Sequence, residues 1–227
     1  MTLLLALLLA AGPRQHLGPP VPEQIRKVVT LAPSLSEVVL ALKPDLVLAE
    51  PAPANRGPVE TLARLGIPVE AFPLSTVQDI EDALTGIGKL LALEQNGRDL
   101  KESIEAARAR ARERARGKPR TRALLIFGIA PLVVAGPRSF AGELLADTGA
   151  ENAAGDNEHP FFRISAEAAV KAAPEVIVLC GVEPPPGRPV LPGLEKARIA
   201  KLRSTALLHP GPRIAEALDD LTAAIGR

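Results

Sequence analysis

The strongest constraint on the fold of this 227-residue chain is an internal repeat. Residues 37–48 and 167–178 match position for position, and each copy carries a glutamate, a short apolar run, a proline, a second acidic residue and an aliphatic run. Because proline disfavours helical geometry in the residue before it, each copy predicts a short helix that ends at Pro44 or Pro174, followed by a buried strand. The repeat therefore predicts two similar α/β lobes.

The rest of the chain alternates in the same way between strand-like and helix-like patterns. Strands are expected at 27–33, 45–49, 67–72, 123–127, 132–135 and 175–180, and helices at 34–43, 58–65, 76–93, 98–116, 140–148, 165–172 and 213–225. Such alternation is typical of parallel sheets with helical crossovers. We expect an α/β protein of two lobes with mainly parallel sheets, joined by a long rigid helix.

The joining helix is expected at 98–118, where alanine and charged residues alternate. Its arginines recur at every second position, which scatters them around a helix of 3.6 residues per turn and forms no single basic face. A solvated helix between two bodies explains this pattern better than a nucleic-acid site. The predicted organisation is a signal-like segment and linker at 1–22, a first lobe at 23–97, the helix, and a second lobe at 119–227.

The N-terminal segment resembles a secretory signal. Residues 3–11 are all apolar, and the Pro- and Gly-rich stretch 12–22 follows. The apolar run is too short to cross a bilayer, which needs about 20 residues. No Lys or Arg precedes it, so a misassigned start of the chain is the alternative. We expect a periplasmic or extracytoplasmic protein.

Composition excludes several functions. The 27 basic and 26 acidic side chains nearly cancel, so no field attracts nucleic acid. A single cysteine, Cys180, excludes an internal disulfide and cysteine-rich metal sites, and its apolar surroundings predict a buried residue. Phosphate-binding loops, nucleophile elbows and zinc-protease motifs are absent from the sequence. We expect no enzyme, cofactor or metal.

Three loops at strand ends are candidates for contact with a ligand. Ala32, Pro33 and Ser34 precede a predicted helix, whose first amides are free. The turn 136–140 offers Gly136 and the guanidinium of Arg138. The loop 159–163 holds Phe161 and Phe162, for which burial in the core is an equal alternative.

Six segments together resemble a known family. They are 27–37, 42–48, 65–69, 135–140, 149–152 and 210–214, in that order along the chain. They are similar to the class III periplasmic substrate-binding proteins of ABC importers for vitamin B12 and iron-siderophores, most closely to the B12-binding branch. The resemblance implies two α/β lobes bridged by a helix, a ligand held between the lobes, and delivery to a membrane permease.

The resemblance also implies site residues. A glutamate on each lobe of that family docks onto permease arginines, and the matching positions are Glu37 and Glu167. The expected ligand-binding residues are Ala32, Pro33, Ser34, Glu50, Gly136, Arg138, Phe161 and His209.

The chain departs from the family pattern in its first lobe. A segment that family members carry before the strand at 45–49 is missing, so the first lobe is shortened, and Glu50, Ala206 and Leu207 stand where aromatic residues are expected. A corrinoid is the leading ligand, followed by a ferric siderophore; haem comes last because the sequence has no tyrosine to serve as an axial ligand. We expect a monomer. The alternative is a truncated relative that acts as an interaction module or has lost tight binding.

Overall fold

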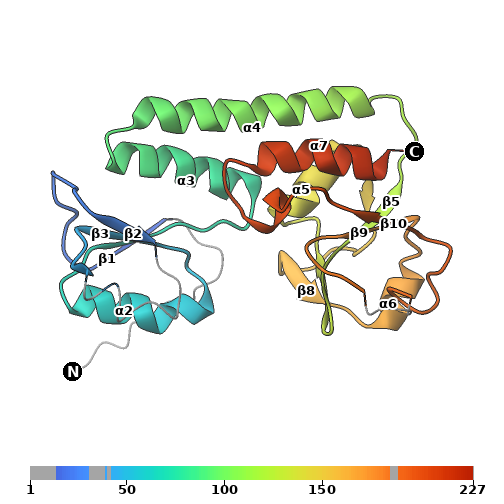
Figure 1. Ribbon diagram of the computed structural model, residues 1–227, viewed down its shortest axis with the longest axis horizontal. Helices are drawn as coiled ribbons and strands as arrows, with labels where there is room; N and C mark the ends of the chain where they lie inside the picture. The colour runs from blue at the N-terminus through green and yellow to red at the C-terminus, as the bar shows by residue number, and fades with distance from the viewer. Residues whose placement is uncertain (1–13, 31–38, 40–41, 185–188, 227) are drawn as a thin grey trace. The chain divides into compact units, whose positions relative to one another are not determined.

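The computed structural model describes residues 14–30, 39, 42–184 and 189–226. The chain forms two compact units, one ending at Leu74 and the other beginning at Ser75 (Figure 1). Both units are of the α/β type. Each is described here on its own.

The first unit is built on a four-stranded sheet with the order β1-β4-β3-β2. Strands β2 (Val28–Thr30), β3 (Leu46–Ala49) and β4 (Val69–Ala71) are parallel, and β1 (Gln15–Leu17) pairs with β4 in the antiparallel direction. The short η2 (Pro53–Asn55) leads into α2 (Arg56–Arg64), which ends before Gly66 in the left-handed region. The apolar face of α2 packs Val59 and Leu62 onto the sheet residues Val47 and Val69.

The second unit contains a six-stranded sheet with the order β10-β9-β5-β6-β8, and β7 pairs with β5. The strands are β5 (Arg122–Ile129), β6 (Leu132–Ala135), β7 (Glu151–Asn152), β8 (Phe161–Arg163), β9 (Val176–Leu179) and β10 (Arg198–Lys201). Strands β5, β7, β9 and β10 are parallel, whereas β6 and β8 are antiparallel to their neighbours.

Helices cover both faces of this sheet (Figure 1). On one side lie α4 (Glu94–Ala115), α5 (Phe140–Asp147) and α7 (Ile214–Ile225), and α3 (Val77–Leu90) forms a helical hairpin with α4. On the other side, α6 (Ala166–Lys171) buries Ala169 against Leu124 and Ile177. A short η3 (Ala206–Leu208) precedes α7. In the described part of the chain no helix is long and apolar enough to span a membrane.

The described residues of the two copies of the repeat, 42–48 and 172–178, adopt the same local geometry in separate sheets. Strand β3 and strand β9 occupy equivalent positions of the repeat, as predicted. The residue before each proline has a positive φ, 46° at Lys43 and 47° at Ala173. Non-glycine residues adopt this conformation infrequently. Its occurrence at equivalent positions shows that the repeat is structural as well as sequential.

The second acidic residue of each copy also has an equivalent role. Asp45 accepts hydrogen bonds from the backbone N–H groups of Arg26 and Lys27, both at 2.8 Å, just before β2. Glu175 accepts one from the N–H of Arg122, at 3.0 Å, at the start of β5. The bonds from the backbone lower the pKa of Asp45. Each carboxylate therefore fixes the start of the strand that pairs with its own.

Helix α4 begins and ends earlier than the predicted 98–118, and it is not solvated on all sides. Ile104, Ala107 and Ala111 are buried in a stripe along one face. Arg108 and Arg112 both reach the buried Asp147 on α5, with Nε to carboxylate distances of 2.5 and 2.6 Å. The small alanine side chains let the neighbouring helices α3, α5 and α7 approach α4 closely. Helix α4 belongs to the second unit, as does α3. That α4 also joins two lobes stays a prediction.

Several segments expected to be irregular form strands. Residues 15–17, placed in a linker by the sequence, form β1, and residues 161–163, placed in a loop, form β8. In β1, His16 Nδ1 lies 2.8 Å from the buried carboxylate of Glu70, which also accepts from Arg14 Nε at 2.7 Å. Strands β7 and β10 were likewise not expected. All are short edge or bridging strands that are defined by a distant partner rather than by their own pattern.

Candidate ligand-binding site

The two adjacent phenylalanines of β8 have different environments. Strand β8 pairs with β6 so that Ala135 faces Phe161 and Val134 faces Phe162. Because side chains alternate along a strand, the two rings point to opposite faces of the sheet. Phe162 packs against the apolar core beside α6. Phe161 points away from that core, and that its ring contacts a ligand stays a prediction.

Phe161 is part of an aromatic cluster with Phe127 and Phe140. Its ring centroid lies 5.1 Å from that of Phe127 in an edge-to-face arrangement, and 5.8 Å from that of Phe140. Phe140 is buried, whereas Phe127 and Phe161 are partly exposed. A register shift between Ile126 and Gly128 marks an irregularity in the pairing of β5 with β6 at Phe127. The cluster presents apolar ring surface at the edge of the second unit's core.

The turn between β6 and α5 supports this cluster. Ser139 caps α5 by accepting a hydrogen bond from the N–H of Gly142 at 3.0 Å, and its hydroxyl donates to the carbonyl of Gly136 at 2.7 Å. Gly136 is buried, and a Cβ atom there would lie 2.7 Å from Cε1 of Phe162. The glycine thus lets β8 approach the turn. Gly136 supports the site through its backbone.

Arg138, expected to bind an anionic group, is already paired. Its Nε and Nη2 atoms donate to the two carboxylate oxygens of Asp156 at 3.0 and 2.8 Å. The guanidinium holds the pKa of Asp156 below its usual value, and both side chains are exposed. Exposed pairs of this kind contribute little stability. A ligand anion would therefore have to compete with Asp156.

His209 is exposed in the second unit, immediately after η3. Among the described residues, no ring contact or hydrogen bond joins its side chain to the aromatic cluster. Ala206 and Leu207, which stand in place of an expected aromatic, are buried. The N–H of Gly136 donates to the carbonyl of Pro160, so Gly136 lies beside the start of β8, with Arg138 in the same turn and His209 on a separate segment.

In the first unit, Glu50 directly follows β3 at its carboxyl end. Its side chain is exposed, yet partial desolvation raises the pKa of its carboxyl. Its carbonyl accepts a hydrogen bond from Asn55 Nδ2 at 2.9 Å. Ala32, Pro33 and Ser34, and the predicted docking residue Glu37, lie outside the described residues.

Glu167 lies in the first turn of α6 and is exposed. Ser165 caps this helix by accepting from the N–H of Ala168 at 3.0 Å. On the inward side of α6, Ala169 is fully buried. A carboxylate at a helix N-terminus is favoured by the helix dipole, and here it faces solvent.

The His, Cys, Asp and Glu side chains of the described residues do not gather into a metal-binding cluster. No cluster of three or more His, Cys, Asp or Glu side chains suited to a metal is found among them. Cys180 is buried, and desolvation raises the pKa of its thiol, which leaves it protonated at neutral pH. The prediction that this cysteine is a buried, inert side chain is confirmed.

The described residues combine a duplicated helix-proline-strand element with an aromatic cluster in the second unit. The chain matches the family model described as periplasmic binding protein over residues 26–184, and it belongs to this family. The family binds and transports substrates and performs no catalysis, as the sequence predicted.

Known relatives agree with this assignment. The vitamin B12-binding protein of Salmonella typhi is 29% identical over 163 residues, which cover 72% of this chain and 61% of the relative. The chain thus spans less than two thirds of that protein. The periplasmic vitamin B12 binding protein of Vibrio cholerae has a TM-score of 0.70 at 18% identity, covering 87% of this chain and 95% of that chain. A periplasmic heme binding protein from Pseudomonas aeruginosa has a TM-score of 0.69 at 27% identity, with coverages of 84% and 75%.

Sequence reasoning identified Phe161 and overlooked Phe127 and Phe140. These three residues are separated by at least 13 positions in the chain, and only the pairing of β5, β6 and β8 brings them together. The chain has five phenylalanines and no Tyr or Trp, and three of the five form the cluster. This scarcity of aromatic residues is a signal in the sequence that could have pointed to Phe127 and Phe140.

Proposed function

We propose that the chain is the extracytoplasmic substrate-binding protein of an ABC importer and that its ligand is a corrinoid. The aromatic cluster of Phe127, Phe140 and Phe161 is the observation that supports binding of a large, partly apolar ligand. The curated relatives named above, which bind vitamin B12, favour a corrinoid over an iron-siderophore. The absence of tyrosine from the sequence places haem last.

Titration with cyanocobalamin tests the ligand. The purified chain should melt at a higher temperature with increasing cyanocobalamin, since ligand at 100 times its Kd adds about 2.7 kcal/mol of stability. Ferrichrome and hemin, titrated in parallel, distinguish the siderophore and haem readings. A chain that shows no shift with any of the three at millimolar concentration supports the alternative, a truncated relative without tight binding.

The proposal includes docking to a permease through Glu167, and through Glu37 at the equivalent position of the repeat. Glu167 is exposed, and the side of α6 opposite to it is buried, so its carboxylate is available to a partner's arginine. Exposed charge pairs mainly orient an encounter and contribute little affinity individually. The proposed site of action is the periplasm or its equivalent, and the proposed state is a monomer.

Glu167→Ala is expected to leave cyanocobalamin affinity unchanged and to weaken capture by the membrane permease about two- to fivefold. Capture is measured by pull-down with permease in nanodiscs. Glu113→Ala, which removes an exposed glutamate from α4, is the matched control and should behave as the unaltered chain. Loss of cyanocobalamin binding in Glu167→Ala would assign this residue to the ligand site instead.

A further inference from the structure

The turn from β6 to α5 and the loop that leads into β8 are held side by side in the second unit. The N–H of Gly136 donates to the carbonyl of Pro160 at 2.8 Å, and Asn152 Nδ2 donates to the carbonyl of the last residue of β6 at 3.0 Å. The turn continues into Phe140 and the loop into Phe161, and the rings of these two residues are in contact. The turn and the loop therefore border the aromatic cluster.

One exposed ion pair connects this turn to this loop. Arg138 donates through Nε and Nη2 to both carboxylate oxygens of Asp156, and the two side chains are 59% and 68% exposed. Asp156, and after it Glu158, raise the pKa of the guanidinium. Counted with histidine neutral, residues 136–139 and 152–160 carry one cation and two carboxylates. The formal charge beside the aromatic cluster is thus negative, although an arginine is present.

This arrangement affects charged and uncharged ligands differently. A ligand carboxylate can bind Arg138 only by displacing Asp156, which the chain holds beside the guanidinium, and it then meets the repulsion of both loop carboxylates. A ligand that presents apolar surface and amide groups leaves the ion pair intact and packs against the rings. Because specificity is a difference between two affinities, repulsion of one ligand is enough to create it.

We propose that Asp156 sets the charge selectivity of the ligand site: by occupying Arg138, it makes the second unit favour a ligand without carboxylates. This role of Asp156 rests on the proposed function, because it requires the ligand to lie against the aromatic cluster. The side chains of the corrin ring in cyanocobalamin are amides, whereas hemin carries propionate carboxylates. Asp156 therefore favours a corrinoid over haem through charge.

Isothermal titration of the full chain and of Asp156→Asn with cyanocobalamin and with hemin tests the proposal. We expect Asp156→Asn to bind hemin about two- to fivefold more tightly, because the freed guanidinium can pair with a propionate in place of Asp156. Its affinity for cyanocobalamin should be unchanged. Adding Arg138→Gln to Asp156→Asn should remove the gain, since this second substitution takes away the freed cation.

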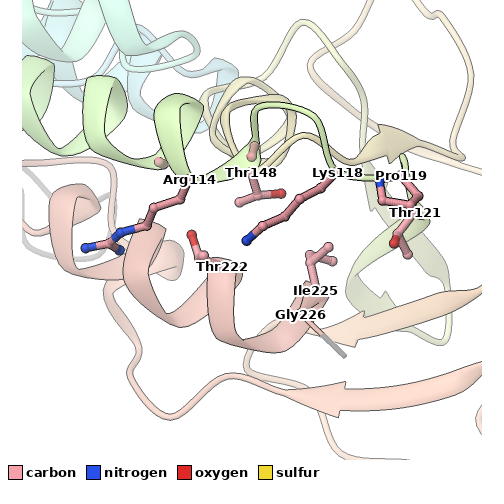
Figure 2. Close-up of a pocket in the computed structure, with 10 residues that line it drawn as sticks. Arg114, Lys118, Pro119, Thr121, Thr148, Thr222, Ile225 and Gly226 are labelled. Carbon is pink, nitrogen blue, oxygen red and sulfur yellow. The ribbon is translucent and has the colours of Figure 1, made fainter.

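Asp219→Asn is the matched control. It removes another exposed carboxylate of the second unit, which pairs with Arg114 at 3.1 Å. Arg114 lines the pocket shown in Figure 2, and this pocket shares no residue with the turn or the loop. Asp219→Asn therefore changes the net charge by the same amount as Asp156→Asn and should leave both affinities unchanged.

Hemin affinity that does not rise in Asp156→Asn would overturn the proposal. So would an equal rise in Asp219→Asn, which would show a general effect of net charge, or a rise that persists after Arg138→Gln. Loss of cyanocobalamin binding in Asp156→Asn would make Asp156 a direct ligand contact instead. A chain that binds no cyanocobalamin contradicts the proposed function, and the comparison of hemin affinities between the variants still decides the role of Asp156.

Discussion

Phe161 and Phe162 are neighbours in the chain but serve different purposes. One ring joins the aromatic cluster and stays partly exposed, and the other packs onto the core beside α6. Alternation along β8 is the cause of this division. A three-residue strand thus places one phenylalanine on each face of the sheet, and that Phe161 forms part of a ligand surface stays a prediction.

We expect truncation of Phe162 to affect mainly stability, and truncation of Phe161 to affect mainly ligand binding. Phe162→Ala should lower the free energy of unfolding by about 2–3 kcal/mol, because it leaves a void in the core. Phe161→Ala should cost about 1 kcal/mol, since it loses ring contacts at a partly exposed position, and should weaken cyanocobalamin binding. Urea melts and ligand titrations of both variants measure these effects. Equal losses of stability would show that both rings belong to the core.

For single residues, the sequence predicted where a residue lies in the fold better than it predicted which side chains that residue contacts. Gly136 lies beside the start of β8 through its bond to Pro160, and that it shares a ligand site with Phe161 stays a prediction. Arg138 was expected to be available to a ligand, but Asp156 binds its guanidinium. Such a pair, 18 residues apart across a loop, has no local pattern that would reveal it in advance.

At the scale of elements, helix α4 is attached to α5 through one buried carboxylate. Asp147 accepts from both Arg108 and Arg112, and Arg108 also contacts Glu143 at 3.4 Å. Desolvation raises the pKa of the Glu143 carboxyl. At a pH near that pKa, Glu143 is partly protonated and binds the arginines more weakly than Asp147 does. Asp147 is therefore the main anchor between the two helices.

Asp147→Asn should lower the free energy of unfolding by about 2–3 kcal/mol, because it leaves the half-buried Arg108 without its main counter-charge. The midpoint of urea unfolding measures the loss. Asp156→Asn, which breaks the exposed pair with Arg138, is the control and should cost less than about 1 kcal/mol. If the two substitutions cost the same, the contact between α4 and α5 depends on apolar packing alone.

The left-handed residues of the repeat allow a further test. Ala173 has φ of 47°, which is strained for alanine and natural for glycine. We expect Ala173→Gly to stabilise the chain by about 0.5–1 kcal/mol. The preceding residue, Ala172, has φ of −64° and is the control, because Ala172→Gly should destabilise by about the same amount. Thermal melts compare the two variants; a loss of stability in both would contradict this account.

Element boundaries could be predicted wherever the chain carries its own start and stop signals. Strand β6 has the predicted bounds, and α5 and α7 differ from prediction by one residue at most at either end. Strands β1, β8 and β10 were missed because each has three or four residues and depends on a partner far away in the chain. Their hydrogen bonds, rather than their composition, define them.

At the scale of the whole molecule, the duplication predicted from the sequence is present in two separate sheets. Each copy contributes one strand, β3 or β9, that pairs in parallel with the strand whose start its acidic residue fixes. The family match covers residues 26–184 and therefore includes both copies. The chain nevertheless spans only 61% of the Salmonella typhi protein, so the ligand and the permease remain subjects for experiment.

Strand β1 has a consequence for how the protein is prepared for binding assays. Its pairing with β4 and the bond from Arg14 to Glu70 make residues 14–17 part of the first sheet. Loss of these residues would strip an edge from this sheet and leave the buried Glu70 carboxylate without Arg14 and His16. Recombinant protein intended for binding assays should therefore retain Arg14.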